Sequence, residues 1–64
     1  MINGTIAKYR KETGMSTEEL CMRTGIKEPT FYLRMRNPDA FRIGEIKAIC
    51  KVLGIPRSEV FSDV

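Results

Sequence analysis

The sequence predicts an all-α fold, a compact bundle of about five short helices. Apolar residues recur at three- and four-residue spacing along most of the chain, and glycine or proline follows each such stretch. No stretch alternates apolar and polar residues between turn residues, so the sequence contains no strand signal. With 64 residues, of which 42% are hydrophobic, the chain can bury one core. We therefore expect a single domain over residues 1–64.

The first helix is expected over about residues 5–13. Ile6 and Tyr9 supply its apolar side. Gly14 is expected to end it, because glycine readily adopts the left-handed conformation that follows a helix.

The second helix has the clearest start in the chain. Ser16 and Glu19 frame the pattern S-T-E-E, which predicts a capping box in which each side chain bonds the backbone amide of the other residue. Met15 before the cap and Leu20 after it are placed to form a hydrophobic staple. Gly25 is expected to end this helix after two turns.

The third helix is expected to begin with Glu28 as its cap and Pro29 as its first residue, because proline favours that position. Phe31 and Met35, four residues apart, mark its inward side. The Asn-Pro pair at 37–38 is expected to end it.

The fourth helix is expected over about residues 43–53, with Gly54 closing it. Its apolar residues at helical spacing are Ile46, Ile49, Cys50 and Leu53. Pro56 then opens a last turn or short helix that carries Val60 and Phe61.

Several classes of function are not expected. Cys21 and Cys50 each lie in an apolar helical stripe, which predicts two buried, reduced thiols. Without histidine and without a paired cysteine motif, no metal site is expected. No cofactor, small-molecule ligand or enzymatic activity is expected, because the chain lacks a glycine-rich phosphate loop and a base near either thiol. No secretory signal or membrane span is seen, so we expect a cytoplasmic protein.

Positive charge is clustered along the chain. The net charge is +3. Most acidic residues lie outside the middle segment, where the basic residues are Arg23, Lys27, Arg34, Arg36 and Arg42. A second basic group near the start of the chain comprises Lys8, Arg10 and Lys11. Clustered cations with segregated acids are typical of a protein with a polyanionic partner, although they also suit a solvated helix face.

The second and third helices flank a tight turn at residues 25–27 and together predict a helix-turn-helix over about residues 17–36. Leu20, Ile26, Phe31 and Met35 are expected to form its shared core. Such a pair can present its second helix to the major groove of DNA, which is wide enough for an α-helix.

The segment TEELCMRTGIKEPTFYLRMRNP resembles the helix-turn-helix of the phage lambda repressor and Cro family, a group of xenobiotic-response-element-like regulators. The following segment, FRIGEIKAICKVLGIPRSEVF, resembles the fourth and fifth helices of that family. The features that match are Leu20, the small residue Cys21, Gly25, Ile26, Phe31 and the ending Leu53-Gly54-Ile55. The resemblance implies a lambda-repressor-like fold. It also implies a small transcriptional regulator of repressor or Cro type, from a phage or prophage, that binds double-stranded operator DNA of palindromic sequence.

The resemblance also assigns roles to residues. Base reading falls to the third helix and its start, at Lys27, Glu28, Pro29, Tyr32, Leu33 and Arg36. Phosphate contacts fall to Thr17, Glu18, Arg23 and the loop after the third helix. Arg34 stands beside Arg36 as a candidate for pairing with guanine. Thr30 is expected either to support the helix or to contact phosphate.

Two alternatives stay open. Pro29 and Leu33 are apolar where polar base-reading side chains are expected, so Leu33 contacts either thymine methyl groups or a protein. The rival function is therefore a protein-binding module of the same fold, of anti-repressor or antitoxin type. A weak or DNA-assisted homodimer is also expected, because the sequence has more apolar residues near its end than one small core needs. These residues are Phe41, Ile55, Val60 and Phe61.

Overall fold

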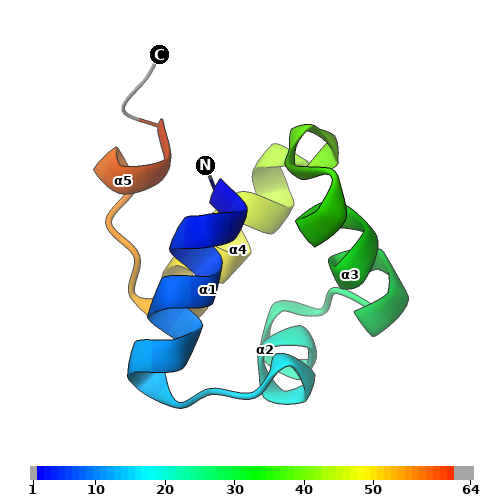
Figure 1. The fold of residues 1–64 in the computed structure, drawn as a ribbon, viewed down its shortest axis with the longest axis horizontal. Coiled ribbons are helices and arrows are strands. Elements are labelled where there is room, and N and C mark those ends of the chain that lie inside the picture. The colour runs from blue at the N-terminus through cyan, green and yellow to red at the C-terminus, as the bar shows by residue number, and fades with distance from the viewer. Residues whose placement is uncertain (1, 62–64) are drawn as a thin grey trace.

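The computed structural model describes residues 2–61, which form helices, turns and short connections (Figure 1). In chain order the elements are α1 (Ile2–Thr13), α2 (Thr17–Thr24), α3 (Glu28–Arg36), the 3₁₀ turn η1 (Pro38–Ala40), α4 (Ile43–Leu53) and α5 (Ser58–Phe61). The predicted all-α fold with about five short helices is confirmed. The helix-turn-helix predicted over residues 17–36 corresponds to α2, the turn at 25–27 and α3. None of the described helices has the length and apolar character needed to cross a membrane.

One core joins the first four α-helices. Ile6, Leu20, Phe31 and Ile49 come one from each of α1 to α4, and each is less than 2% exposed. Helix α4 packs against both α1 and α2, while α2 also packs against α3. The expected core of the helix-turn-helix is confirmed, since Ile26 is also buried and Met35 packs against the cluster. Every helix therefore depends on its neighbours for burial of its apolar side.

Helix α1 begins at Ile2, three residues before the expected start near residue 5. The Asn3 side chain accepts a hydrogen bond from the Gly4 amide at 3.0 Å. Its Nδ2 also donates to the Met35 carbonyl at 3.2 Å, which ties the start of α1 to the last turn of α3. Ile2 packs against the core. The bond to Met35 and the packing of Ile2 on the core extend the helix beyond the point that the local sequence pattern indicates.

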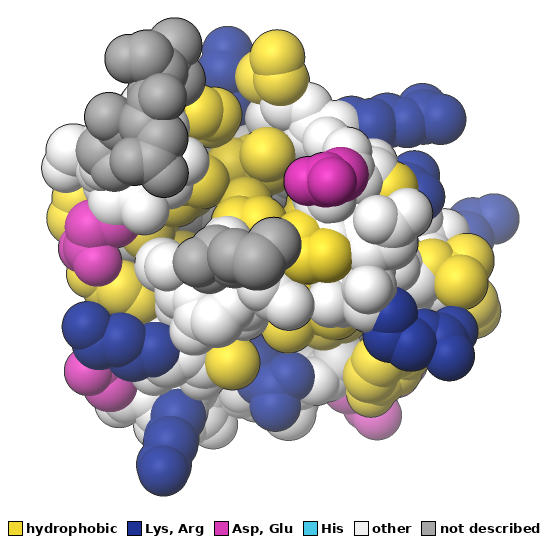
Figure 2. Space-filling view, turned by 45° about the horizontal axis from the view of Figure 1, so that its top comes forward, with side chains coloured by type: hydrophobic (Ala, Val, Ile, Leu, Met, Phe, Trp, Pro, Cys, Tyr) yellow, Lys and Arg dark blue, Asp and Glu magenta, His cyan; other side chains and the backbone are white. Residues whose placement is uncertain are grey.

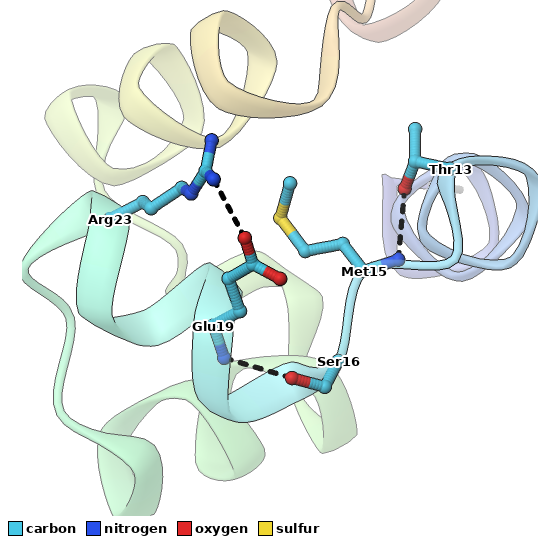
Figure 3. A network of polar contacts seen from close by, with 5 residues as sticks. All are labelled: Thr13, Met15, Ser16, Glu19 and Arg23. Atoms are coloured by element: carbon cyan, nitrogen blue, oxygen red, sulfur yellow. Dashed lines mark hydrogen bonds and ion pairs between the residues drawn. The ribbon is translucent and has the colours of Figure 1, made fainter.

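Helix α2 is capped at its start as the sequence predicts, but only by one half of the expected capping box (Figure 3). The Ser16 Oγ accepts a hydrogen bond from the Glu19 amide at 3.1 Å. The Glu19 carboxylate, which was expected to reach back to Ser16, instead pairs with Arg23 at 2.7 Å. A cation one helical turn ahead competes for the carboxylate with the backbone amide. Met15 packs against the core as expected of a staple residue.

Glycine ends α2 and α4, as predicted. Gly25 and Gly54 have φ of 78° and 73°, a left-handed conformation that glycine adopts without a steric cost from a side chain. The Gly25 amide donates to the Cys21 carbonyl at 2.9 Å, which satisfies one of the unpaired carbonyl groups at the helix end. The sharp turn at Gly25 brings the chain directly into α3.

The start of α3 differs by one residue from the prediction. Lys27, rather than Glu28, is the cap residue, with an extended backbone. The Phe31 amide donates to the Lys27 carbonyl at 2.9 Å and closes the first helical turn. Glu28 is therefore the first helical residue, and Pro29 lies at the second position. The first four amides of a helix have no partner within it, so the missing amide hydrogen of Pro29 costs no hydrogen bond there.

Three of the four apolar residues named for a dimer, Phe41, Ile55 and Val60, belong to the core or pack against it, which corrects the argument made for a dimer. The turn η1 carries Phe41 inward, and Phe41 and Ile55 are only 9% and 5% exposed. Val60 packs against the same cluster. Helix α5 packs on α1, where the Tyr9 hydroxyl donates a hydrogen bond to Glu59. This bond, with burial and the nearby carboxylates, raises the pKa of Tyr9 to about 12. Phe41 and Ile55 are thus not spare apolar surface.

Both cysteines are free and buried, as expected. Burial is the main cause that raises the pKa of the Cys21 and Cys50 thiols above the ordinary value. Both side chains therefore stay protonated near neutral pH and act as small apolar core residues.

The Ser16 cap yields a test of the fold. Ser16→Ala should lower the free energy of unfolding by about 1 kcal/mol, because the Glu19 amide loses its acceptor. Ser16→Asp should retain most of the stability, because aspartate is an equally good cap. Thermal and urea unfolding followed by circular dichroism measures both effects. Equal stability of the alanine variant and the wild type would contradict the cap's contribution.

Candidate nucleic-acid interface

Helix α3 has one exposed face and one face turned to the protein. Phe31 is buried at 1% exposure, and Met35 packs against the core beside it. Thr30 and Arg34 are partly buried on the flank toward α4. The exposed residues follow helical spacing and are Glu28, Pro29, Tyr32, Leu33 and Arg36, which we call the α3 face. The structure thus brings together five of the residues predicted to read bases, and Lys27 lies exposed at the helix cap.

The α3 face carries exposed apolar surface. Leu33 is 54% exposed and Tyr32 is 50% exposed. The Tyr32 ring lies edge-on to that of Phe31, with 6.0 Å between the ring centres, so the buried ring supports the exposed one. Pro29 is exposed one helical turn before Leu33. The centre of this face therefore offers aliphatic and aromatic surface, with its charged residues at the two ends.

Arg34 is not on this face, because Glu45 of α4 holds it. The Arg34 Nε donates to Glu45 Oε1 at 3.0 Å, and the two side chains are 19% and 17% exposed. The same carboxylate oxygen accepts a hydrogen bond from the Arg42 amide at 3.0 Å, at the start of α4. One carboxylate thus joins the side of α3 to the first turn of α4. In this arrangement Arg34 fixes the helix, whereas Arg36 remains exposed.

The surroundings of Glu45 stabilise its charged form. Partial burial acts to raise the pKa of Glu45, but the hydrogen bonds from the Arg42 amide and the Arg34 guanidinium outweigh it. The pKa of Glu45 is therefore lower than its ordinary value. The ion pair is thus fully formed at neutral pH.

Two of the α2 residues expected to contact phosphate, Thr17 and Arg23, have partners within the chain. The Thr17 hydroxyl accepts a hydrogen bond from the Arg10 guanidinium, which links α1 to the start of α2. Arg23 pairs with Glu19 but remains exposed, with 55% of its side chain accessible. Glu18 is exposed in the first turn of α2. Of this set, Arg23 is the cation that stays accessible to a ligand.

A second accessible region lies between α3 and α4. Lys27 and Arg42, the cap residues of these two helices, are exposed at the rim of an open hollow of about 540 Å³. Thr30 and Gly44 also line it, and the Glu45 carboxylate that faces it is paired with Arg34. Thr30 is therefore beside Lys27, in a position that serves either of its expected roles.

The surface view supports this grouping (Figure 2). Along the right-hand edge, the side on which α3 lies in Figure 1, Lys and Arg side chains are interspersed with hydrophobic ones. Such a mixture of cations and apolar groups is suited to a ligand that has both anionic groups and flat apolar surface.

Two residues that organise the site were not singled out from the sequence. No motif of the sequence marks Glu45, and Arg10 is only one member of a basic group. Their partners lie 11 and 7 residues away in the sequence, across different helices. No local pattern marks such pairs, because they depend on how the helices pack.

The fold and the exposed helix define a helix-turn-helix protein. Residues 5–64 match the family described as the Cro/C1-type HTH DNA-binding domain. The chain belongs to this family, and the predicted resemblance to the lambda repressor and Cro type is confirmed. No curated protein and no solved structure gave a significant match. The class of function is thus that of a domain that binds double-stranded DNA and regulates transcription.

The hydrogen bonds that Glu45 accepts yield a test of how α3 is held against α4. Glu45→Gln should lower the free energy of unfolding by about 1–2 kcal/mol at pH 7, because two hydrogen bonds lose a charged acceptor. The pKa of Glu45 is lower in the folded state than in the unfolded chain. Its contribution is therefore complete above about pH 4.3 and is lost as the pH falls through the lowered value.

The measurement is urea unfolding of wild type and variant between pH 3 and pH 7. Glu12→Gln serves as the control, because Glu12 is exposed on α1. The stability gap between wild type and Glu45→Gln should close at the acidic end. A gap that is absent at pH 7, or unchanged down to pH 3, would contradict the role given to Glu45.

Proposed function

We propose that this protein binds double-stranded DNA sequence-specifically by placing α3 in the major groove, and that it acts as a small repressor or Cro-like regulator of a phage or prophage. The observation that carries the proposal is the α3 face, five exposed residues on a helix whose other side is fixed by the core and by Glu45. Family membership supports DNA as the ligand.

The dimensions of α3 suit this role. A nine-residue helix is roughly 13–14 Å long, and base pairs are spaced by roughly 3.4 Å, so α3 spans about four base pairs. The major groove, about 12 Å wide, admits a helix of this diameter. Arg36 at the end of α3 can pair with the two acceptors of guanine, and Glu28 at its start can accept from the amino group of cytosine.

Charged groups beside α3 would set the position on the duplex. Lys27 and Arg42 lie exposed at the starts of α3 and α4, and Arg23 lies exposed at the end of α2. Cations at such positions neutralise phosphates and add affinity that does not depend on sequence. Arg34 contributes by holding the helix against Glu45 rather than by contacting bases.

Four base pairs are few for a specific site, which favours binding as a pair of copies on a palindromic operator. The described part of the chain measures 30 × 23 × 17 Å, so two copies side by side fit recognition helices one DNA turn apart, roughly 34–36 Å. Because Phe41 and Ile55 are buried, the dimer we propose is weak and assembles on DNA.

The second candidate function is binding of a protein through the same face. Leu33 and Tyr32, each about half exposed, favour this alternative because exposed apolar side chains are common at protein interfaces. Salt separates the two functions. Binding through an apolar protein interface changes little with salt, whereas DNA binding weakens by roughly 0.9 log unit per log unit of salt for each phosphate neutralised.

The test is selection of duplexes from a random pool at low salt, followed by affinity measurements on the selected duplex. Arg36→Ala should weaken binding to the selected duplex by roughly 10- to 100-fold, because one bidentate base contact is lost. Arg57→Ala is the charge-matched control, because Arg57 comes directly before α5 in the chain, and α5 lies on the opposite side of the molecule from α3 (Figure 1). It should weaken binding only slightly.

Fluorescence anisotropy at several salt concentrations measures both affinities and the salt slope. The proposed function fails if the folded protein binds no duplex at low salt. Equal losses of affinity for Arg36→Ala and Arg57→Ala would contradict base reading by α3. They would remain consistent with a general electrostatic attraction of the protein to DNA.

A further inference from the structure

The centre of the α3 face has no side-chain group that can form hydrogen bonds with base edges except the Tyr32 hydroxyl. Pro29 and Leu33 are both exposed, and their side chains hold only carbon and hydrogen. They lie four residues apart on one helix, where Cβ atoms are roughly 5–6 Å from each other. The two side chains therefore form a continuous aliphatic strip along the helix, with Glu28 before it and Arg36 after it.

In the major groove only one base edge offers an apolar group, the C5 methyl of thymine. Guanine, cytosine and adenine carry no methyl group there, and an aliphatic side chain pressed against their hydrogen-bonding groups would leave those groups without partners at a cost in free energy. An aliphatic strip pressed against the groove floor therefore favours thymine over the other bases. We propose that Leu33 and Pro29 are specificity-determining residues that select thymine by its methyl group. This inference rests on the proposed function.

The geometry gives the proposal a register. Because the strip is roughly 5–6 Å long and base pairs are roughly 3.4 Å apart, the two side chains reach methyl groups one or two base-pair steps apart. Arg36 lies three residues beyond Leu33, roughly 4.5 Å along the axis, which places a guanine next to the thymines. The half-site is thus a short run containing thymine and bordered by guanine.

DNA is favoured over a protein as the occupant because charges bracket the strip. Lys27 is exposed at one end of α3 and Arg36 at the other, which suits a ligand with phosphates on both sides of an apolar centre. The single acid on this face, Glu28, has a partner available in the same groove, the amino group of cytosine.

Deoxyuridine provides the test, because it differs from thymidine only by the missing methyl group. A duplex selected from a random pool by the wild-type protein is remade with deoxyuridine at one thymine position at a time. Binding of the wild type should weaken about fourfold at one or two positions of each half-site, the effect of one buried methyl group. Other thymine positions should show no change.

Variants assign the effect to the strip. Leu33→Ala should remove the discrimination at the position that Leu33 contacts, where thymine and deoxyuridine duplexes should bind within about 1.5-fold of each other instead of the fourfold difference of the wild type. Pro29→Ala should do the same at the second position, where there is one. Met22→Ala is the matched control, because Met22 is a 76% exposed apolar residue on α2 and not on the α3 face. It should keep the wild-type discrimination. Circular dichroism confirms that all three variants remain helical.

The outcomes separate this inference from the function on which it rests. Binding of the selected duplex with no effect of deoxyuridine at any position overturns methyl recognition and leaves DNA binding by α3 intact. Discrimination that survives at every position in both Leu33→Ala and Pro29→Ala assigns methyl recognition to other residues and overturns the role of the strip. Failure to bind any duplex overturns the proposed function and this inference together.

Discussion

The burial of Phe31 is the constraint on which the rest of the site depends. Helix α3 has only nine residues, too few for an isolated helix to be stable in water. Phe31 is the one side chain of α3 that is fully buried, and it shares a cluster with Ile6, Leu20 and Ile49 from three other helices. Without this anchor α3 would not form, and without α3 the chain would have no face to present to DNA. The capping and turn residues around it serve to bring Phe31 to the core.

Phe31 and Met35 hold one side of α3 against the core, and three polar contacts further fix the rotation of the helix about its axis. The Arg34–Glu45 pair holds the flank of α3 to α4, and the Asn3 amide bonds the carbonyl of Met35 near the end of the helix. Glu45 also accepts from the Arg42 amide, so its position is fixed by the start of α4. As a result, α1 and α4 decide together which residues of α3 face outward. The orientation of the exposed face is a property of the whole bundle.

Features encoded in neighbouring residues could be predicted from the sequence, and features that depend on packing could not. Ser16 and Gly25 mark the ends of α2, and the apolar spacing of Leu20, Ile26 and Phe31 gave the core of the helix-turn-helix. The early start of α1 depends on a bond between residues 32 positions apart. The position of Arg34 away from the α3 face depends on a partner 11 positions away in the sequence. For the site, the helical spacing of apolar residues could identify the exposed residues of α3. It could not show that Arg34 faces α4 and pairs there, whereas Arg36 points to solvent.

The exposed α3 face implies that affinity and base preference come from two different kinds of contact. Cations such as Lys27 and Arg42 would supply affinity through phosphates, and this term falls as salt rises because it depends on counterion release. Contact between an aliphatic side chain and a methyl group depends on burial of apolar surface, which moderate salt does not weaken. A protein that reads bases mainly with Pro29 and Leu33 would therefore lose affinity with salt faster than it loses its preference for thymine. The acidic residue Glu28 on the same face also contributes to base preference rather than to affinity. Its negative charge repels phosphate, and it stabilises binding only where its carboxylate can accept from the amino group of cytosine.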